Sequence, residues 1–211
     1  MNVHLSKKIK FILFPTVRNL MVRRLMSALD FKGIESVLVI GAGNDPYRSS
    51  FREATHYICL DSRKTQGVTD VIADGMSLPF VDSYFHCIVA TEVLEFIREP
   101  HTFAREIHRV LMQGGIAILT IPFMFNIHND RVRLTQLSLI EIFDEFTEVT
   151  VITQGNRLHT IWDLVTTSFW PWSIFLPLRI LSNLFFLVPS SLMLKDSKSS
   201  APTGYSIILK K

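Results

Sequence analysis

The sequence predicts a doubly wound α/β domain, in which helices cover both faces of a largely parallel sheet. Short apolar runs rich in Val, Ile and Leu alternate along the chain with segments of helical periodicity, which is the pattern of such sheets. Hydrophobic residues make up 48% of the chain and charged residues 19%, a composition that excludes an intrinsically disordered protein. The length of 211 residues suits one well-packed domain and is too short for two ordinary ones.

The first 34 residues form a predicted basic, amphipathic helical segment. Residues 1–29 contain six Lys or Arg and no Asp or Glu, and apolar side chains are interleaved with them. Such a segment either covers the domain as a helix or lies on an anionic membrane surface. The apolar stretch after Lys10 is interrupted by Pro15 and Arg18, which argues against a signal peptide.

Residues 35–157 carry the alternation and form the predicted core domain. Phe103, Ile107, Val110 and Leu111 recur at helical spacing and predict one helix. The connection between residues 61 and 71 is too short for a full crossover helix. The expected strands cover residues 36–40, 57–60, 71–73, 87–90, 116–121, 146–152 and 205–209.

A long apolar stretch precedes the last expected strand, which lies in the closing segment 197–211. Residues 164–178 and 180–194 contain no charged side chain, but each is shorter than the roughly 20 residues that a membrane span needs. We therefore predict an apolar helical insertion over residues 158–196. It either touches a membrane surface, with Trp162, Trp170 and Trp172 at the interface, or forms buried helices or an oligomer interface.

Glycine and acidic residues follow the first three expected strands. Gly41 and Gly43 allow the backbone to turn sharply and to approach a ligand closely, and Pro46 would begin a helix capped by Asn44 or Asp45. Asp61 follows the second strand about twenty residues later, a distance at which a carboxylate can accept hydrogen bonds from a ribose diol.

The third strand is followed by Asp74, Gly75 and Met76, which suit an exocyclic amine beside an apolar surface, and the fourth is followed by Thr91. Because ligands of such sheets lie outside the carboxyl ends of the strands, these residues together predict a site for a nucleoside-containing ligand. Pro46 stands where a dinucleotide fingerprint has its third glycine, so a nicotinamide oxidoreductase is the less favoured alternative.

With these motifs in place, residues 36–154 resemble the class I S-adenosylmethionine-dependent methyltransferases, in particular small enzymes found among bacterial surface-polysaccharide and glycolipid genes. Residues 204–210 resemble the closing strand of that family. The resemblance implies a Rossmann-like sheet of seven strands whose last strand is antiparallel and forms a hairpin with the sixth. The matching motifs cover residues 37–47, 57–61, 74–80, 91–95 and 103–115.

The resemblance also implies a role for each cofactor residue. Gly41 and Gly43 would face the methionine part, Asp61 the ribose, Asp74 the adenine amine and Met76 the adenine ring. The full predicted cofactor set comprises Gly41, Gly43, Asn44, Asp61, Asp74, Gly75, Met76 and Thr91. The chain departs from the family at Val39, where an acidic residue usually helps to hold the methionine end, and at Phe96, where histidine is frequent.

The acceptor side is expected after the fifth strand, between residues 122 and 135. His128 is a candidate general base because neutral imidazole can take a proton at pH 7, with Asp130 beside it. Arg133 could clamp a phosphate or carboxylate of the acceptor. In the alternative interpretation His128 is a solvated loop residue and Asp130 caps the following helix. Glu92, Glu95 and His101 are further candidates.

The resulting prediction is an O-methyltransferase that uses S-adenosylmethionine on a glycan, a glycolipid or another small acceptor near a membrane. It would be cytoplasmic or peripheral on the membrane, with no metal site and no nucleic-acid partner. Cys59 and Cys87 lie in apolar runs, which excludes a disulfide-built scaffold. The alternative is a non-catalytic binding or scaffold protein that keeps the methyltransferase fold.

Overall fold

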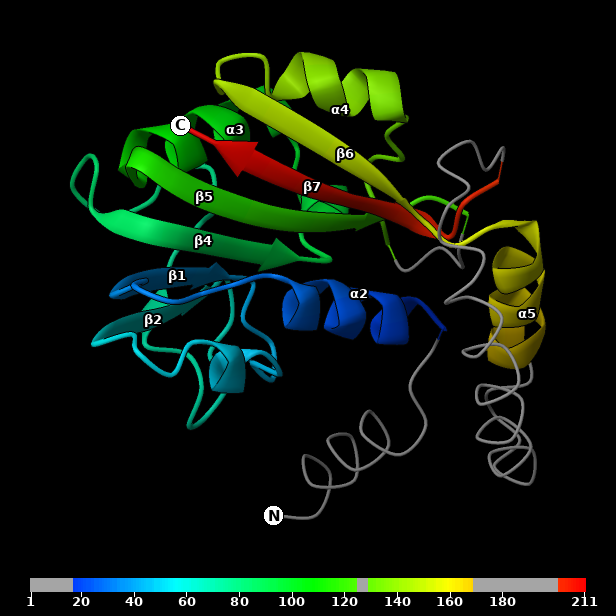
Figure 1. The fold of residues 1–211 in the computed structure, drawn as a ribbon, viewed down its shortest axis with the longest axis horizontal. Helices are drawn as coiled ribbons and strands as arrows, with labels where there is room; N and C mark the ends of the chain where they lie inside the picture. Colours follow the sequence, from blue (N-terminus) through cyan, green and yellow to red (C-terminus); the bar gives the residue numbers. More distant parts are fainter. Residues whose placement is uncertain (1–16, 125–128, 169–200) are drawn as a thin grey trace.

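The computed structural model describes residues 17–124, 129–168 and 201–211 and shows one seven-stranded sheet with helices on both faces (Figure 1). The strand order is β3-β2-β1-β4-β5-β7-β6. This arrangement confirms the predicted Rossmann-like α/β fold, including the antiparallel last strand. Residues 1–16 of the predicted N-terminal segment, residues 169–196 of the predicted insertion and residues 197–200 of the closing segment lie outside the described residues. The same holds for His128 and the other residues from 125 to 128.

Five neighbouring strands pair in parallel, and one strand late in the chain reverses the direction. β7 lies between β5 and β6 and pairs with both of them in antiparallel register. β1 is buried along its whole length, which explains why its sequence is apolar at every position after Ser36 rather than alternating. The strands are β1 (Ser36–Ile40), β2 (His56–Asp61), β3 (Val71–Ile72), β4 (Phe85–Thr91), β5 (Leu111–Pro122), β6 (Glu148–Gln154) and β7 (Gly204–Lys210).

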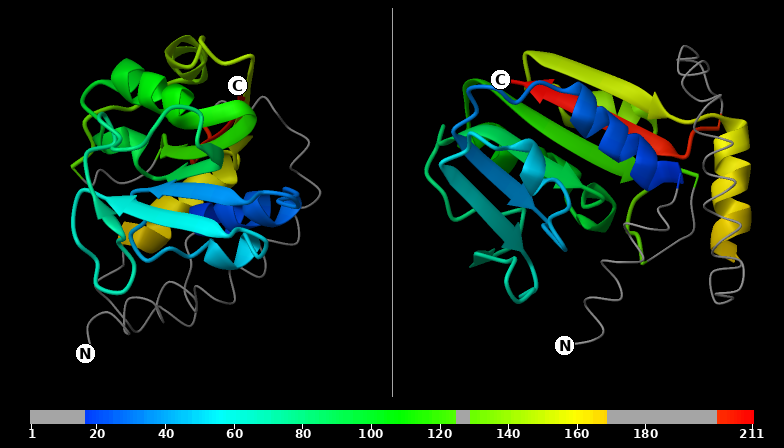
Figure 2. Two further views of the ribbon diagram at one scale, coloured as in Figure 1. Left: turned by 90° about the vertical axis from the view of Figure 1, so that its left-hand side faces the viewer. Right: turned by 60° about the horizontal axis from the view of Figure 1, so that its bottom comes forward.

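The helices divide the core into two layers. α3 and α4 cover one face of the sheet and α2 covers the other, while α5 stands at the end where β6 finishes and β7 begins (Figures 1 and 2). Leu38 and Ile40 of β1 pack in the layer of α3, and Val37 and Val39 pack in the layer of α2. The helices are α2 (Val17–Ala28), α3 (Pro100–Val110), α4 (Gln136–Ile142) and α5 (Arg157–Ser168), with short 3₁₀ turns η1 (Arg48–Ser50) and η2 (Leu94–Phe96).

The prediction of a helix beginning at Pro46 is wrong, because in the fully described connection from β1 to β2 only the turn η1 forms. Asp45 adopts a φ of 46° and does not cap a helix. Its carboxylate instead accepts hydrogen bonds from the side chains of Arg48 at 2.8 Å and Tyr57 at 2.7 Å. These side-chain bonds compete with helix initiation and hold the connection in a compact turn.

Other boundaries differ from the predicted ones by a few residues. The spacing places Leu111 in a helix, but Leu111 already pairs with Phe85 in β5, so α3 ends at Val110. β6 begins at Glu148 rather than at Phe146, which is buried against the apolar core. The cap of α4 is Thr135, whose hydroxyl accepts from the Ser138 N–H, and not Asp130 as the alternative interpretation required.

All residues between β2 and β3 are described and none of them forms a crossover helix, in agreement with the short connection in the sequence. Within the part of the chain that the structure describes, no helix combines the length and apolarity needed to cross a membrane. α5 forms the start of the predicted insertion, with Leu158, Ile161 and Val165 exposed on it.

Candidate cofactor and acceptor site

The predicted cofactor residues gather at the carboxyl edge of the parallel strands. β1 has β2 on one side and β4 on the other, so the loops after these strands leave the sheet at its topological switch point. This is where open α/β sheets bind their ligands.

The glycine loop after β1 is tied directly to the end of β2. Gly41 and Ala42 donate their N–H groups to the Leu60 carbonyl at 2.8 and 3.2 Å. Gly43 donates its N–H to Asp61 Oδ2 at 3.2 Å. The two predicted methionine-side glycines and the predicted ribose carboxylate therefore form one continuous surface.

Gly41 has both a conformational and a steric reason to be glycine. Its φ is +66°, in the left-handed region, and a Cβ at this position would overlap the side chain of Val93 from the turn after β4. The loop after β1 and the turn after β4 are therefore in close contact.

Asp61 is oriented by backbone amides on both of its oxygens. Oδ2 accepts from Gly43, and Oδ1 accepts from the Arg63 N–H at 3.0 Å. A carboxylate offers about four acceptor positions, so these bonds leave room for hydroxyl groups of a ligand. This geometry fits the ribose-binding role that the resemblance assigns.

Asp74 lies beside Asp61 because the N–H of Ala73, the residue before it, donates to the Asp61 carbonyl at 3.2 Å. The Asp74 side chain is exposed, and its Oδ1 accepts from the Met76 N–H at 3.0 Å. Gly75 is buried, and a Cβ there would come within 2.8 Å of the Phe103 ring. Packing against α3 is therefore enough to explain this glycine.

The turn after β4 carries an ion pair with a buried arginine, which sequence reasoning missed. Arg18 of α2 is 1% exposed, and its Nε and Nη2 donate to Oε2 and Oε1 of Glu92 at 2.5 Å each. Glu92 follows Thr91 directly, and its N–H donates to the Thr120 carbonyl at 3.0 Å. In the sequence, Arg18 stands out only as one of the basic residues of the N-terminal segment.

The acceptor-side residues Asp130 and Arg133 are joined to each other by an ion pair. Arg133 also donates from Nη1 to the Phe123 carbonyl at 2.8 Å, and the Asp130 side chain is only 5% exposed. These contacts shape the loop after β5. The predicted roles of His128, Asp130 and Arg133 in catalysis remain predictions.

Glu95 lies next to this loop as a buried carboxyl group. The backbone carbonyl of Glu95 accepts hydrogen bonds from the N–H groups of Arg131 at 2.7 Å and Val132 at 3.2 Å. Its Oε2 is buried and has no hydrogen-bond partner among the described residues. Burial first, and then the negative charge of Glu92, raise the pKa of the Glu95 carboxyl to about 8.

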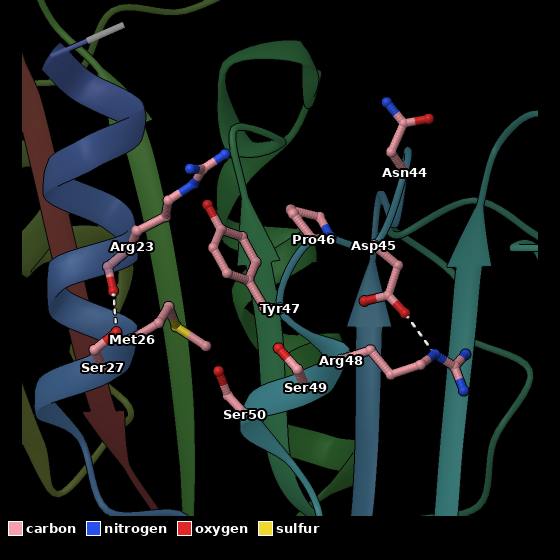
Figure 3. Close-up of a pocket in the computed structure, with 10 residues that line it drawn as sticks. All are labelled: Arg23, Met26, Ser27, Asn44, Asp45, Pro46, Tyr47, Arg48, Ser49 and Ser50. Carbon is pink, nitrogen blue, oxygen red and sulfur yellow. Dashed lines mark hydrogen bonds and ion pairs between the residues drawn. The ribbon is translucent and has the colours of Figure 1, made fainter. Parts of the chain in front are cut away.

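A groove of about 700 Å³ opens between α2 and the turn η1 (Figure 3). It is lined by Arg23, Met26, Ser27, Asn44, Asp45, Pro46, Tyr47, Arg48, Ser49 and Ser50. Over residues 17–124, 129–168 and 201–211, no group of three or more His, Cys, Asp or Glu could hold a metal ion.

The region that contains the residues of the carboxyl edge matches a known protein family. Residues 39–119 match the model of a family described as "Methyltransferase domain". The matched region contains the glycine loop, Asp61, Asp74 and Glu92, the residues that form the carboxyl edge.

Solved structures share the fold over nearly the whole chain. A SAM-dependent methyltransferase from Archaeoglobus fulgidus has a TM-score of 0.62 at 14% identity, covering 98% of this chain and 99% of its own. A possible histamine N-methyltransferase from Thermotoga maritima has a TM-score of 0.60 at 13% identity, covering 99% and 96%.

Phosphoethanolamine N-methyltransferase 2 of Haemonchus contortus, solved with S-adenosyl-L-methionine, has a TM-score of 0.58 at 14% identity over 92% of this chain and 52% of its own. An uncharacterized protein of Methanocaldococcus jannaschii is 39% identical over 56 residues. That match spans only about a quarter of either chain, 26% of this one and 27% of the relative.

The partial family match and the shared fold support the predicted enzyme class, an S-adenosylmethionine-dependent methyltransferase, and the predicted cofactor.

Proposed function

We propose that the protein transfers a methyl group from S-adenosylmethionine to a hydroxyl group of a glycan, a glycolipid or another small acceptor close to a membrane surface. The observation that carries the proposal is the hydrogen bond between the Gly43 N–H and Asp61 Oδ2. It joins the loop that would approach the methionine part to the carboxylate that would bind the ribose.

The bound cofactor would supply the methyl group on a sulfonium, which is already an excellent leaving group. The chain then has to align the acceptor and to receive the proton of its hydroxyl group. His128 is the proposed proton acceptor and Arg133 the proposed contact to an anionic group of the acceptor. Asp130 would act by positioning Arg133, with which it forms an ion pair.

The proposed membrane contact is supported by an apolar stripe on α5. Leu158, Ile161 and Val165 are 54%, 58% and 43% exposed and follow one another at helical spacing. The sequence continues from this helix into the stretch without charged residues, and the basic N-terminal segment would favour an anionic lipid surface. Localisation at the membrane periphery and a role in polysaccharide biosynthesis are parts of this proposal.

Calorimetric titration of the purified protein with S-adenosylmethionine and S-adenosylhomocysteine tests the cofactor part. We expect saturable binding of both molecules, and no binding would refute the proposal at its base. A labelled-methyl assay on cell-envelope extracts then tests turnover, with His128→Ala as the matched variant. Binding without methyl transfer to any extract component would favour the non-catalytic scaffold.

Sedimentation with anionic liposomes tests the membrane part separately. We expect the protein to pellet with the liposomes, and the triple variant Leu158→Ser, Ile161→Ser, Val165→Ser to pellet less. A protein that stays in the supernatant, and that keeps its activity when residues 164–194 are deleted, would contradict the membrane contact while leaving the methyltransferase assignment intact.

A further inference from the structure

Arg18 joins α2 to the tip of β4 and to the start of β7. Besides its two bonds to Glu92, its Nη1 donates to the Thr203 carbonyl at 3.0 Å. The next residue is Gly204, where a Cβ would overlap the Arg18 guanidinium. The sheet therefore leaves a space for this guanidinium, and the guanidinium in turn fixes the position of the Glu92 carboxylate.

Glu92 is held in an uncommon conformation but keeps hydrogen-bonding capacity. Its φ is +57°, a strained value for a residue with a side chain, which the bonds to Arg18 and Thr120 maintain. Oε1 accepts from Arg18 and, at 2.6 Å, from the Thr120 hydroxyl, whereas among the described residues Oε2 accepts from Arg18 alone. The side chain is 36% exposed, so Oε2 retains an acceptor position for a ligand.

The position of Glu92 places it at the methionine end of the cofactor site. The adjacent residue, Val93, occupies the space that a Cβ on Gly41 would need. β4 is the neighbour of β1 in the sheet, so the residue at the tip of β4 stands beside the glycine loop at the switch point.

A cation from α2 lies near the same place. Arg23 lines the groove between α2 and η1, and Figure 3 shows its guanidinium beside the Tyr47 hydroxyl. Burial first, and then the charge of Glu92, raise the pKa of Tyr47 to about 12, while the charges of Arg23 and Arg18 oppose this change. Arg23 and Tyr47 line the same groove, so this cation from α2 stands at the loop that follows the glycines.

The amino-acid end of S-adenosylmethionine is a zwitterion with an α-ammonium and an α-carboxylate. We propose that Glu92 accepts a hydrogen bond from the α-ammonium and that Arg23 donates to the α-carboxylate, with Arg18 as the residue that positions Glu92. This inference rests on the proposed cofactor. It assigns to Glu92 the charge that Val39, buried in the apolar layer beneath α2, does not provide.

The test compares two ligands that differ in the amino-acid end. S-adenosylhomocysteine carries the amino-acid end, whereas 5′-methylthioadenosine keeps the nucleoside and the sulfur without it. Calorimetric titration of the full chain is expected to give at least tenfold tighter binding of S-adenosylhomocysteine, since one charge-assisted hydrogen bond is worth about 10- to 100-fold in affinity.

The variants Glu92→Gln and Arg23→Gln are each expected to weaken S-adenosylhomocysteine binding by about 10- to 100-fold and to leave the affinity for 5′-methylthioadenosine unchanged. Glu141→Gln and Arg24→Gln are matched controls, because both residues are exposed and make the same change of charge. Arg18→Lys is also expected to weaken S-adenosylhomocysteine binding relative to 5′-methylthioadenosine binding. Thermal unfolding of each variant separates loss of binding from loss of folding.

The outcomes distinguish this inference from the cofactor proposal. A wild-type protein that binds neither ligand would refute both. A wild-type protein that binds both ligands equally well would refute the inference alone, and this result needs no variant. Variants that fold but lose both ligands to the same extent, or lose neither, would also overturn it.

Discussion

Replacing Glu95 by glutamine is expected to stabilise the protein at neutral pH. The residue is 3% exposed, its Oε2 has no hydrogen-bond partner in the described part of the chain, and its pKa is raised from 4.5 to about 8 in the folded protein. The folded state therefore keeps the proton at pH 7, whereas the unfolded chain releases it. Glutamine imitates the neutral form without this dependence on pH.

The sign of the effect follows from proton binding. Between about pH 4.5 and 8 the folded state holds a proton that the unfolded state has lost, so the free energy of unfolding falls as the pH rises through this range. One pKa unit corresponds to about 1.4 kcal/mol, so at pH 7 the penalty is about 3 kcal/mol and at pH 5 less than about 1 kcal/mol. The glutamine variant should lack this slope.

Urea unfolding at several pH values between 5 and about 9 measures the effect. The difference in free energy of unfolding between Glu95→Gln and the wild type is expected to grow with pH and to level off above about pH 8. Glu141→Gln, at an exposed position of α4, serves as the control and should give no such trend. A difference that stays constant over this range, or that favours the wild type at pH 7, would refute the reasoning.

Two further substitutions test the carboxyl edge of the sheet. Asp61→Asn should weaken S-adenosylhomocysteine binding by about tenfold or more in a calorimetric titration, because the charge that would accept ribose hydroxyls is lost, while the exposed control Asp144→Asn should leave binding unchanged. Gly41→Ala should lower the free energy of unfolding by about 2–4 kcal/mol through its positive φ and the overlap with Val93. Gly33→Ala is the control, because Gly33 has a positive φ of 76° but no described neighbour within 4 Å of the added Cβ. It should lower the free energy of unfolding by only about 1 kcal/mol, measured by urea unfolding as for Gly41→Ala. Equal losses at the two glycines would contradict the steric part of the argument.

The residues that lie at the strand tips could be predicted, because the local backbone or the position after a strand explains which amino acid stands there. Gly41 needs a left-handed backbone, and Asp61 follows an apolar strand at the position of a ligand-binding carboxylate. Signals of this kind depend on a few neighbouring residues and remain visible in a single sequence. The contact between Gly43 and Asp61 then follows from the parallel pairing of β1 and β2.

The ion pair of Arg18 and Glu92 could not be predicted, because its partners are far apart in the sequence. A buried arginine has the same side chain as one on a surface, and the basic composition around Arg18 favours a solvent- or lipid-facing helix. The clearest trace is Gly204, whose missing Cβ accommodates the guanidinium. Glycine is common where strands begin, however, so this residue alone does not point to a buried cation.

The start of β5 could not be predicted for a different reason. Gly114 and Gly115 indicate a turn, and Gly114 does have a φ of 76°. β5 nevertheless continues through the two glycines, because the register between β4 and β5 shifts between Phe85 and Cys87. Leu111 therefore pairs with Phe85 before the glycines. Pairing across a bulge is decided by the partner strand and leaves no periodic signal in one sequence.

The contacts of Arg18 with Glu92 and with the Thr203 carbonyl have a consequence for biosynthesis. Arg18 and the Thr203 carbonyl that it contacts are 185 residues apart, and β7 has to enter between two strands that are already present. During translation the earlier strands emerge first, but the Arg18 guanidinium can complete its contacts only after the Thr203 carbonyl has left the ribosome. In the proposed cofactor site, the contacts that position Glu92 should thus be completed after those of the nucleoside side, at the same time as the sheet itself.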